Sequence, residues 1–463
     1  MAGVENGYAN RVKKRAKPPS EAVYFLSLQL RNARCFGDQP QTLDLSDGAG
    51  KPARWTILLG NNGTGKTTIL QSLVAFELTT NLGDEKPKTP RAFDRRLSNY
   101  WDGFIRFRKG TTLLLAQVAR GSGLTATSAD FQSRNSSISF VRSGTKEGRI
   151  RKEAYVHVTQ SVLCFAYGAG RRLGRSSLVG SETDDPAMSL FLEDFELLNA
   201  EEWLLRLDYS ASKPSDIQKR QQKRLKQVKE LLVNILPDVT DIRLVSPTKK
   251  RPDPAVEFKT PYGWVKLGHL GYGYRTLIAW MVDFASRMVD RYPDSPDPLA
   301  EPAVVLIDEI DLHLHPTWQR TLIGYLTIRF PNTQFIVTAH SPLIVQAASG
   351  IGANIAVLRR QGDHVVIDND KDLIRGWRVD QILTSDLFGL ESARPPDLDQ
   401  PLARRRELLS KPKLTKEDRV ELSLLEEQIG TLPVGKTDAQ ARKMLDLVEE
   451  TQRLLRKREV KPK

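Results

Sequence analysis

Residues 60–67 read Gly-Asn-Asn-Gly-Thr-Gly-Lys-Thr, which matches the pattern G-x-x-x-x-G-K-[ST]. The residues just before it, 55–59, form an unbroken apolar run that predicts a buried strand. The residues after it place Ile69, Leu70 and Leu73 on one face of a helix. A glycine-rich loop between a strand and a helix predicts an α/β fold in which this loop cradles the phosphates of a nucleotide.

The residue types in this loop fit ATP with Mg²⁺. Glycines let successive backbone N–H groups close around the phosphates, and the N-terminus of the next helix adds partial positive charge. Lys66 is expected to reach the terminal phosphates, and the Thr67 hydroxyl is expected to bind Mg²⁺. The residues expected to contact the nucleotide are Asn61, Asn62, Gly63, Thr64, Gly65, Lys66, Thr67 and Thr68.

A second apolar run, residues 303–307, ends in two adjacent carboxylates, Asp308 and Glu309. Alternation along a strand points neighbouring side chains in different directions. Asp308 is therefore expected to hold Mg²⁺ together with Thr67, and Glu309 to orient and deprotonate the attacking water. The alternative, a strand end whose acids only cap the next segment, is disfavoured beside a phosphate loop.

A third apolar run, residues 334–338, is followed by His340. An imidazole at this position is expected to donate to the γ-phosphate and sense its presence, although an isolated histidine is more often structural. His313 and His315 follow the acidic pair, but no third clustered ligand accompanies them. The sequence therefore predicts no metal site on these two histidines.

The chain of 463 residues carries a net charge of +13, which favours contact with polyanions. The charge is concentrated in a predicted helical stretch, which we call the basic run: Lys213, Lys219, Arg220, Lys223, Arg224, Lys226 and Lys229. DNA contact, a solvated helix face and a protein-docking surface all stay open as interpretations of this run. No apolar stretch approaches the ~20 residues of a spanning helix, and residues 1–19 lack the apolar part of a secretory signal. The sequence predicts a cytoplasmic protein with no membrane partner.

Composition and periodicity divide the chain into five expected parts. They are a flexible basic tail (residues 1–22), an N-terminal lobe with the phosphate loop (23–189), a helical basic insertion with its following strand (190–260), a C-terminal lobe with the acidic pair and His340 (261–390), and a helical C-terminal extension (391–463). Within the N-terminal lobe, residues 156–167 are interpreted as one strand.

Together, Lys66, Thr67, Asp308, Glu309 and His340 resemble the Walker A, Walker B and switch-histidine residues of ABC- and SMC-type P-loop ATPases. The resemblance implies an ABC/SMC-type α/β head, a homo-oligomer of two or more chains, and a signature loop that contacts the ATP of the opposite protomer. Residues 270–275, Leu-Gly-Tyr-Gly-Tyr-Arg, stand in the place of that loop, which is usually Leu-Ser-Gly-Gly-Gln. Gly271 replaces the usual serine, so backbone groups of Gly271 and Gly273 together with Arg275 are expected to make the contact.

Other stretches narrow the resemblance. Residues 309–320 are similar to the RecF-like and overcoming-lysogenization-defect branch, and residues 165–172, 201–204 and 376–383 look like the PtuA family of ATPases from Septu anti-phage systems and some retrons. That resemblance implies an HNH-type endonuclease partner in bacterial defence. The alternatives are a RecF- or SMC-like DNA-repair ATPase without a nuclease partner, and a transporter ATPase subunit.

The sequence offers no convincing nuclease site of its own. Only Asp368 and Asp370 resemble the paired metal-binding acids of a Toprim nuclease, and a hydrophilic turn is the favoured interpretation of that segment. Asp308 and Glu309 are already assigned to ATP. Any nucleic-acid cleavage is therefore expected to come from a partner.

Overall fold

The fold is taken from a computed structural model of the chain. It describes residues 22–74, 162–175, 186–193, 195–236, 238–249, 252–369, 376–390, 395–411 and 414–429, together with residues 76, 78–79, 89–90, 111–121, 124, 132–144, 150–156 and 393. The chain divides into two compact units, Met1–Phe388 and Gly389–Lys463.

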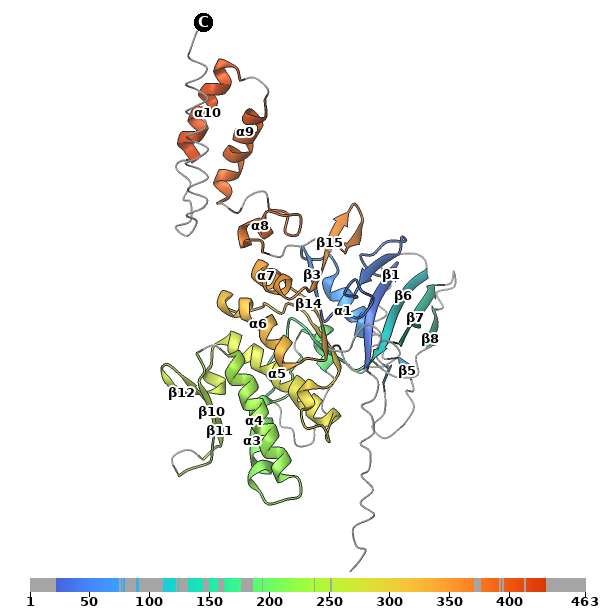
Figure 1. The fold of residues 1–463 in the computed structure, drawn as a ribbon, viewed down its shortest axis with the longest axis vertical. Helices are drawn as coiled ribbons and strands as arrows, with labels where there is room; N and C mark the ends of the chain where they lie inside the picture. Colours follow the sequence, from blue (N-terminus) through green and yellow to red (C-terminus); the bar gives the residue numbers. More distant parts are fainter. Residues whose placement is uncertain are drawn as a thin grey trace, which may run out of the picture. The chain divides into compact units, whose positions relative to one another are not determined.

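A six-stranded sheet organises the first unit (Figure 1). In spatial order its strands are β16 (His364–Asp368), β15 (Asn354–Gln361), β3 (Trp55–Gly60), β14 (Thr333–Thr338), β13 (Ala303–Ile307) and β9 (Cys164–Tyr167). All neighbours pair in parallel except the edge strand β16, which is antiparallel to β15. Because β3, β13 and β14 are parallel, their carboxyl ends meet at one edge of the sheet. That edge carries the residues that follow the three predicted strands.

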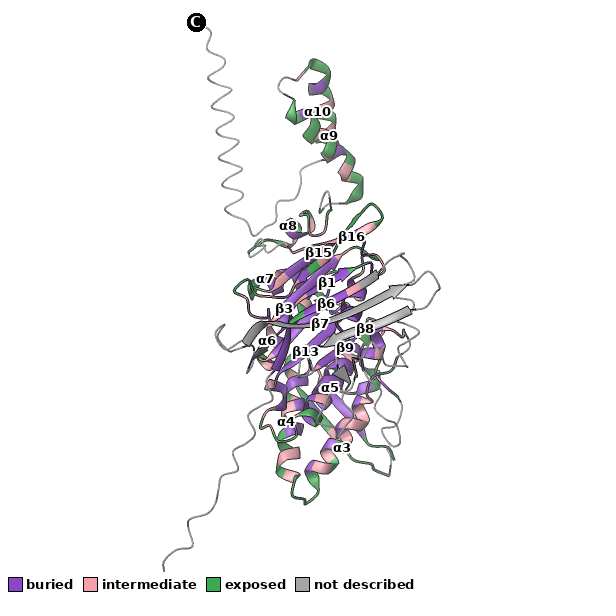
Figure 2. Ribbon diagram, turned by 90° about the vertical axis from the view of Figure 1, so that its right-hand side faces the viewer, coloured by how far each residue is buried: buried purple, intermediate pink, exposed green. Residues whose placement is uncertain are grey.

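The central strands are buried on both faces, which explains their unbroken apolar sequences. In β3, Trp55, Ile57 and Leu59 join one hydrophobic core, while Leu58 joins the other. The first core is closed by α5 (Tyr272–Arg291), α6 (Pro316–Arg329) and α7 (Pro342–Gly350), and the second by α1 (Lys66–Val74). Figure 2 shows this burial along β3, β13 and α5.

A second, antiparallel sheet also packs on the second core, which contains residues of its strands and of α1. Its spatial order is β2 (Gln41–Asp44), β1 (Ala22–Arg31), β6 (Thr111–Gly121), β7 (Gln132–Gly144) and β8 (Ile150–Val156). The Gln334 side chain of β14 links the two sheets, because its Oε1 accepts from the Phe25 N–H at 2.9 Å and its Nε2 donates to the Phe25 carbonyl at 2.9 Å. The interpretation of residues 156–167 as one strand is wrong: Val156 ends β8 in the antiparallel sheet, whereas Cys164 begins β9 in the parallel sheet.

Residues 200–266 form a helical pair and a small sheet beside α5. The elements are α3 (Ala200–Ser212), α4 (Gln218–Ile235), β10 (Asp241–Val245), β11 (Ala255–Thr260) and β12 (Gly263–Lys266). The apolar face of α4, including Val228, Leu231 and Leu232, packs into the first core. Shorter elements of this unit are β4 (Leu78–Thr79), β5 (Thr89–Pro90), η4 (Pro186–Leu190), η5 (Leu267–His269), η6 (Pro298–Ala300) and α8 (Val379–Leu383).

The second unit contains η7 (Pro396–Leu398), α9 (Asp399–Ser410) and α10 (Lys416–Ile429). The two α-helices are joined by ion pairs, of which Arg404 to Glu421 (2.6 Å) and Lys411 to Asp418 (2.7 Å) are the shortest. Residues 430–463 of the expected helical C-terminal extension lie outside the described part of the chain. Within the described residues, no helix is both long and apolar enough to cross a membrane.

Candidate nucleotide site

The loop of residues 60–67 closes tightly because glycines occupy its crowded positions. Gly60 has a φ of 144°, and a Cβ on it would lie 2.6 Å from the Leu358 carbonyl oxygen. Gly65 has a φ of 87°, and a Cβ there would collide with the Cys35 sulfur. Helix α1 begins immediately afterwards at Lys66. The loop therefore presents backbone N–H groups and a helix N-terminus in the arrangement that suits an anion.

Lys66 reaches back across the loop. Its Nζ donates to the carbonyl oxygens of Gly60 at 2.7 Å and Asn61 at 3.1 Å, and the residue is only 7% exposed. Burial lowers the pKa of the Lys66 ammonium because it disfavours the charged form, while the nearby Asp308 carboxylate partly offsets this effect. A positive charge held among loop carbonyls complements the negative charge of a triphosphate.

Asp308 joins the phosphate loop to the other strands of the sheet. The Thr67 hydroxyl donates to Asp308 Oδ2 at 2.7 Å across 241 residues of sequence, and the Thr338 hydroxyl donates to Oδ1 at 2.6 Å. Thr338 Oγ1 also accepts from the Glu309 N–H at 2.7 Å. The side-chain oxygens of Thr67 and Asp308 are the hard ligands that Mg²⁺ prefers, so the residues present fit a magnesium nucleotide.

Glu309 adopts a left-handed backbone conformation with a φ of 48° at the end of β13. This conformation is strained for a residue with a side chain, and such strain persists only where neighbouring groups enforce it. The Thr338 hydroxyl holds the Glu309 N–H, and a buried guanidinium holds its carbonyl. Both contacts therefore hold the backbone of Glu309 in this turn.

That guanidinium belongs to Arg171, a residue to which the sequence assigned no role. Arg171 Nη1 donates to the carbonyls of Gly168 (2.8 Å) and Asp308 (2.6 Å), and Nη2 donates to the carbonyl of Glu309 (2.9 Å). The residue is 2% exposed, and burial lowers its pKa to about 10, partly offset by the Asp308 carboxylate. Arg171 lies in the segment 165–172 that carries a family resemblance, but its role follows from packing and not from a motif.

His340 follows β14, and its side chain is exposed. Its backbone N–H donates to Asp311 Oδ2 at 3.0 Å. Next to it, the Ser341 hydroxyl donates to Gln319 Oε1 at 2.6 Å, while Gln319 Nε2 donates to the Leu314 carbonyl at 3.0 Å. These bonds tie the loop that carries His340 to the loop after Glu309.

The loop of residues 270–275 faces outward at the start of α5. Gly271 caps the helix, and Tyr272 is 49% exposed. A Cβ on Gly273 would collide with the His313 carbonyl oxygen, and the Tyr272 ring meets the His313 ring edge-on at 4.7 Å. The Arg275 guanidinium lies 5.5 Å from the Tyr272 ring centre. This loop therefore packs on the segment that follows Glu309, while part of its surface stays open to solvent.

The two histidines after Glu309 have structural contacts. His315 caps α6, because its Nδ1 accepts from the Thr317 N–H at 3.3 Å. His313 has a φ of 62° and supports Tyr272. In the part of the chain that the structure describes, no group of three histidine, cysteine or acidic side chains could hold a metal ion.

Comparison with known proteins places this site in a family. Residues 56–346 match the family described as "AAA domain, putative AbiEii toxin, Type IV TA system". The chain belongs to this AAA-domain family. The match begins in β3 and ends in α7, so it includes both the phosphate loop and the acidic pair.

Among individual proteins, the chain is 26% identical over 425 residues to Septu protein PtuA of Bacillus mycoides, which covers 91% of the chain and 52% of that relative. It is 32% identical over 175 residues to "Retron Ec83 probable ATPase" of Escherichia coli, covering 38% of the chain and 30% of that relative. The chain thus spans about half the length of the PtuA relative and less of the retron protein. The predicted resemblance to PtuA-like P-loop ATPases is confirmed.

Among solved structures, the chain is similar to an SMC head bound to the C-winged helix domain of ScpA. The match covers 74% of this chain and 97% of the SMC chain, at 15% identity and a TM-score of 0.42. The six-stranded, mostly parallel sheet and the family match confirm the predicted α/β fold of a P-loop ATPase.

Proposed function

We propose that the chain is a Mg²⁺-dependent ATPase whose site lies at the carboxyl edge of the six-stranded sheet. The observation that carries this proposal is the 2.7 Å hydrogen bond between Thr67 and Asp308, which puts the two oxygen ligands of a magnesium nucleotide side by side. Bound Mg²⁺ offsets the negative charge of the phosphates. Lys66 adds a second cation, and residues 61–68 supply backbone and hydroxyl donors.

In this proposal Glu309 orients the attacking water and accepts its proton. The two acids are assigned different roles. The Asp308 carboxylate accepts hydrogen bonds from Thr67 and Thr338, whereas Glu309 lies in the left-handed turn that follows the strand. Arg171 and Thr338 hold that turn on both sides. His340 follows the neighbouring strand and serves as the sensor of the γ-phosphate.

A second copy of the chain completes each site. The start of α5 exposes Gly271 and Tyr272 and carries a helix N-terminus that suits a phosphate. In a two-fold dimer, Gly271, Gly273 and Arg275 of one protomer meet the nucleotide bound to the other. The contact of Tyr272 and Gly273 with His313 supplies a route by which docking affects the segment after Glu309.

The biological role that this chemistry serves is the control of an HNH-type endonuclease partner in anti-phage defence. The similarity to a Septu protein and to retron ATPases supports this proposal. The chain itself is expected to cut no DNA or RNA. The second unit offers a docking surface, because its charged helices expose the apolar side chains Leu409, Val420 and Leu424.

Contact with DNA is proposed for the exposed lysines of the basic run. Lys219, Lys223 and Lys226 are exposed along α4 and fit a phosphate backbone. The sequence prediction that Arg224 belongs to the same surface is wrong. Arg224 is 6% exposed and donates to the Pro293 carbonyl at 2.6 Å, because its helix face packs against the loop after α5.

The proposed ATPase is tested by phosphate release and nucleotide binding on the purified chain. Lys66→Ala is expected to weaken ATP binding, and EDTA is expected to abolish turnover. The partner is tested by pull-down from the native host with the full chain and with a chain ending at residue 394. Recovery of an HNH protein by the full chain alone supports the docking surface, and equal recovery by both chains contradicts it.

A further inference from the structure

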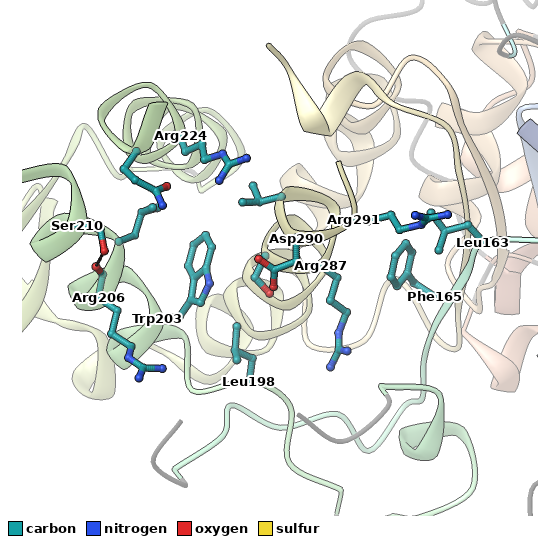
Figure 3. A pocket seen from close by; sticks show the side chains of 14 residues that line it. Leu163, Phe165, Leu198, Trp203, Arg206, Ser210, Arg224, Arg287, Asp290 and Arg291 are labelled. Carbon is teal, nitrogen blue, oxygen red and sulfur yellow. Dashed lines mark hydrogen bonds between the residues drawn. The ribbon is translucent and has the colours of Figure 1, made fainter. Parts of the chain in front are cut away.

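A cavity of about 820 Å³ lies away from the nucleotide site, between β9 and helices α3, α4 and α5. Its volume lies within the range of pockets that enclose small organic ligands. Its apolar walls include Trp203 and Phe165, and charged side chains from three helices also line it. Figure 3 shows Trp203 and Asp290 facing each other, with Arg224 reaching toward them from α4.

Two buried polar atoms that belong to residues lining this cavity lack partners. Arg224 is 6% exposed and uses Nη2 to hold the Pro293 carbonyl, but its Nε has no hydrogen-bond partner among the described residues. Gln221 lies one helical turn earlier, and its buried side-chain Oε1 also has no hydrogen-bond partner among the described residues. Leaving buried polar groups unpaired destabilises the folded chain. A small rotation of either side chain toward a polar ligand would relieve that cost.

Asp290 completes the polar lining. No hydrogen bond to its carboxylate is found among the described residues, and the Arg224 and Arg287 charges lie close enough to act on it. Arg287 itself is committed to Asp283, with contacts of 2.7 and 3.2 Å. Asp283 is fully buried and also accepts from the Tyr167 hydroxyl at 2.9 Å. The wall behind Asp290 is therefore fixed, while the Asp290 carboxylate remains available to a ligand.

We propose that this cavity binds the base of a nucleotide, with guanine preferred. The Trp203 ring offers a surface on which any base can stack. Asp290 accepts from the N1–H and the exocyclic amino group of guanine, and Arg224 donates to its O6 or N7. Arg206 and Arg291 lie toward opposite ends of the cavity and add positive charge for the phosphate (Figure 3).

The same chemistry comes from a free nucleotide or from a nucleotide within a single strand, and two sets of titrations separate these sources. Both use the Lys66→Ala chain, in which the ATP site is disabled, and the preference for guanine separates the cavity from the exposed lysines of α4. Calorimetry with GMP, AMP, CMP and UMP tests the free ligand. Fluorescence anisotropy with single-stranded oligonucleotides, either guanine-containing or all-thymine, tests the strand.

The variants are chosen to spare the fold. Asp290→Asn removes the charged acceptor, and its matched control Asp294→Asn changes an exposed acid that pairs with Arg220 at 3.5 Å outside the cavity lining. Loss of a charged hydrogen bond worth about 1.5–3 kcal/mol predicts roughly 10- to 100-fold weaker guanine binding in Asp290→Asn only. Trp203→Leu is expected to weaken every base.

The proposal is supported when GMP or a guanine-containing strand binds saturably and Asp290→Asn alone among the acid variants weakens it. It is overturned when no nucleotide or strand saturates below about 1 mM, which corresponds to roughly 4 kcal/mol. Guanine binding by the Asp290→Asn and Trp203→Leu chains that is as strong as in the Lys66→Ala parent also overturns it. Equal melting temperatures of the Asp290→Asn and Asp294→Asn chains show that any difference in affinity comes from the cavity.

Discussion

The two halves of the proposed ATP site are built differently. The half formed by residues 60–67 and Asp308 is internally bonded, with Thr67, Asp308 and Thr338 linked by hydrogen bonds of 2.6 to 2.7 Å and with Lys66 and Asp308 buried. The half formed by residues 270–275 is a surface loop with a half-exposed tyrosine at its tip. In the proposed function, one chain arranges the metal ligands and the base by itself. The other half is proposed to act only when a second protomer brings a nucleotide to it.

The largest expected effect comes from removing the proposed general base, Glu309. Glu309→Gln retains the size of the side chain and removes its ability to accept a proton, so turnover is expected to fall at least ~100-fold while ATP remains bound. Phosphate release and equilibrium nucleotide binding measure the two quantities separately. A Glu309→Gln chain that hydrolyses ATP at the parental rate would show that another group is the base.

The second prediction concerns the support behind that base. Arg171→Met is expected to slow turnover about 10- to 100-fold with little change in KM, because Arg171 positions Glu309 through the carbonyls of the Walker B acids. Arg171→Lys, which keeps the charge but not the fork of donors, is expected to recover part of the rate.

A double-mutant cycle separates positioning from general destabilisation. Arg171→Met is expected to cost little further turnover in a Glu309→Gln background, since the base it positions is already absent. Equal losses in both backgrounds, accompanied by a lower melting temperature, would reduce Arg171 to a structural residue.

The parts of the fold that sequence could predict are those encoded locally. The phosphate loop, the acidic pair and His340 each follow an apolar strand, and parallel pairing gathers three such strand ends at one edge. The start of α5 falls at Tyr272 because Gly271 precedes a regular apolar helix face. A local pattern suffices where the chemistry needs consecutive residues.

The parts that sequence missed depend on contacts between distant segments. In the sequence, Arg171 is one basic residue among many. Its role becomes visible only in the structure, where β9 pairs with β13 and the Arg171 guanidinium contacts the carbonyls of Asp308 and Glu309. Arg224 reads as exposed until the loop after α5 covers it. Residues 156–167 read as one strand because apolar alternation does not reveal which sheet a strand joins.

A smaller effect is expected away from both halves. Reversing Lys219, Lys223 and Lys226 to Glu is expected to weaken duplex DNA binding and to reduce the slope of log affinity against log salt by about 3, if each lysine meets one phosphate. ATP turnover without DNA is expected to stay unchanged, because α4 lies outside residues 60–67 and 270–275.

Fluorescence anisotropy across a salt series measures the slope. The matched control reverses Lys249, Lys259 and Lys266, which are also exposed and change the net charge equally. If both triple variants lose the same slope, general charge governs DNA binding. If neither loses any, the exposed lysines of α4 serve as a protein-docking surface instead.

The comparison between the two halves is tested most directly by mixing two inactive chains. Lys66→Ala disables the phosphate loop, and Arg275→Ala disables the loop at the start of α5, so each variant alone is expected to be nearly inactive. Random pairing in two-fold dimers restores one intact composite site in half of the dimers, which predicts roughly a quarter of the parental ATPase activity. A mixture that stays inactive while both variants dimerise normally, or parental activity in an unambiguously monomeric chain, would contradict a site completed by a second protomer.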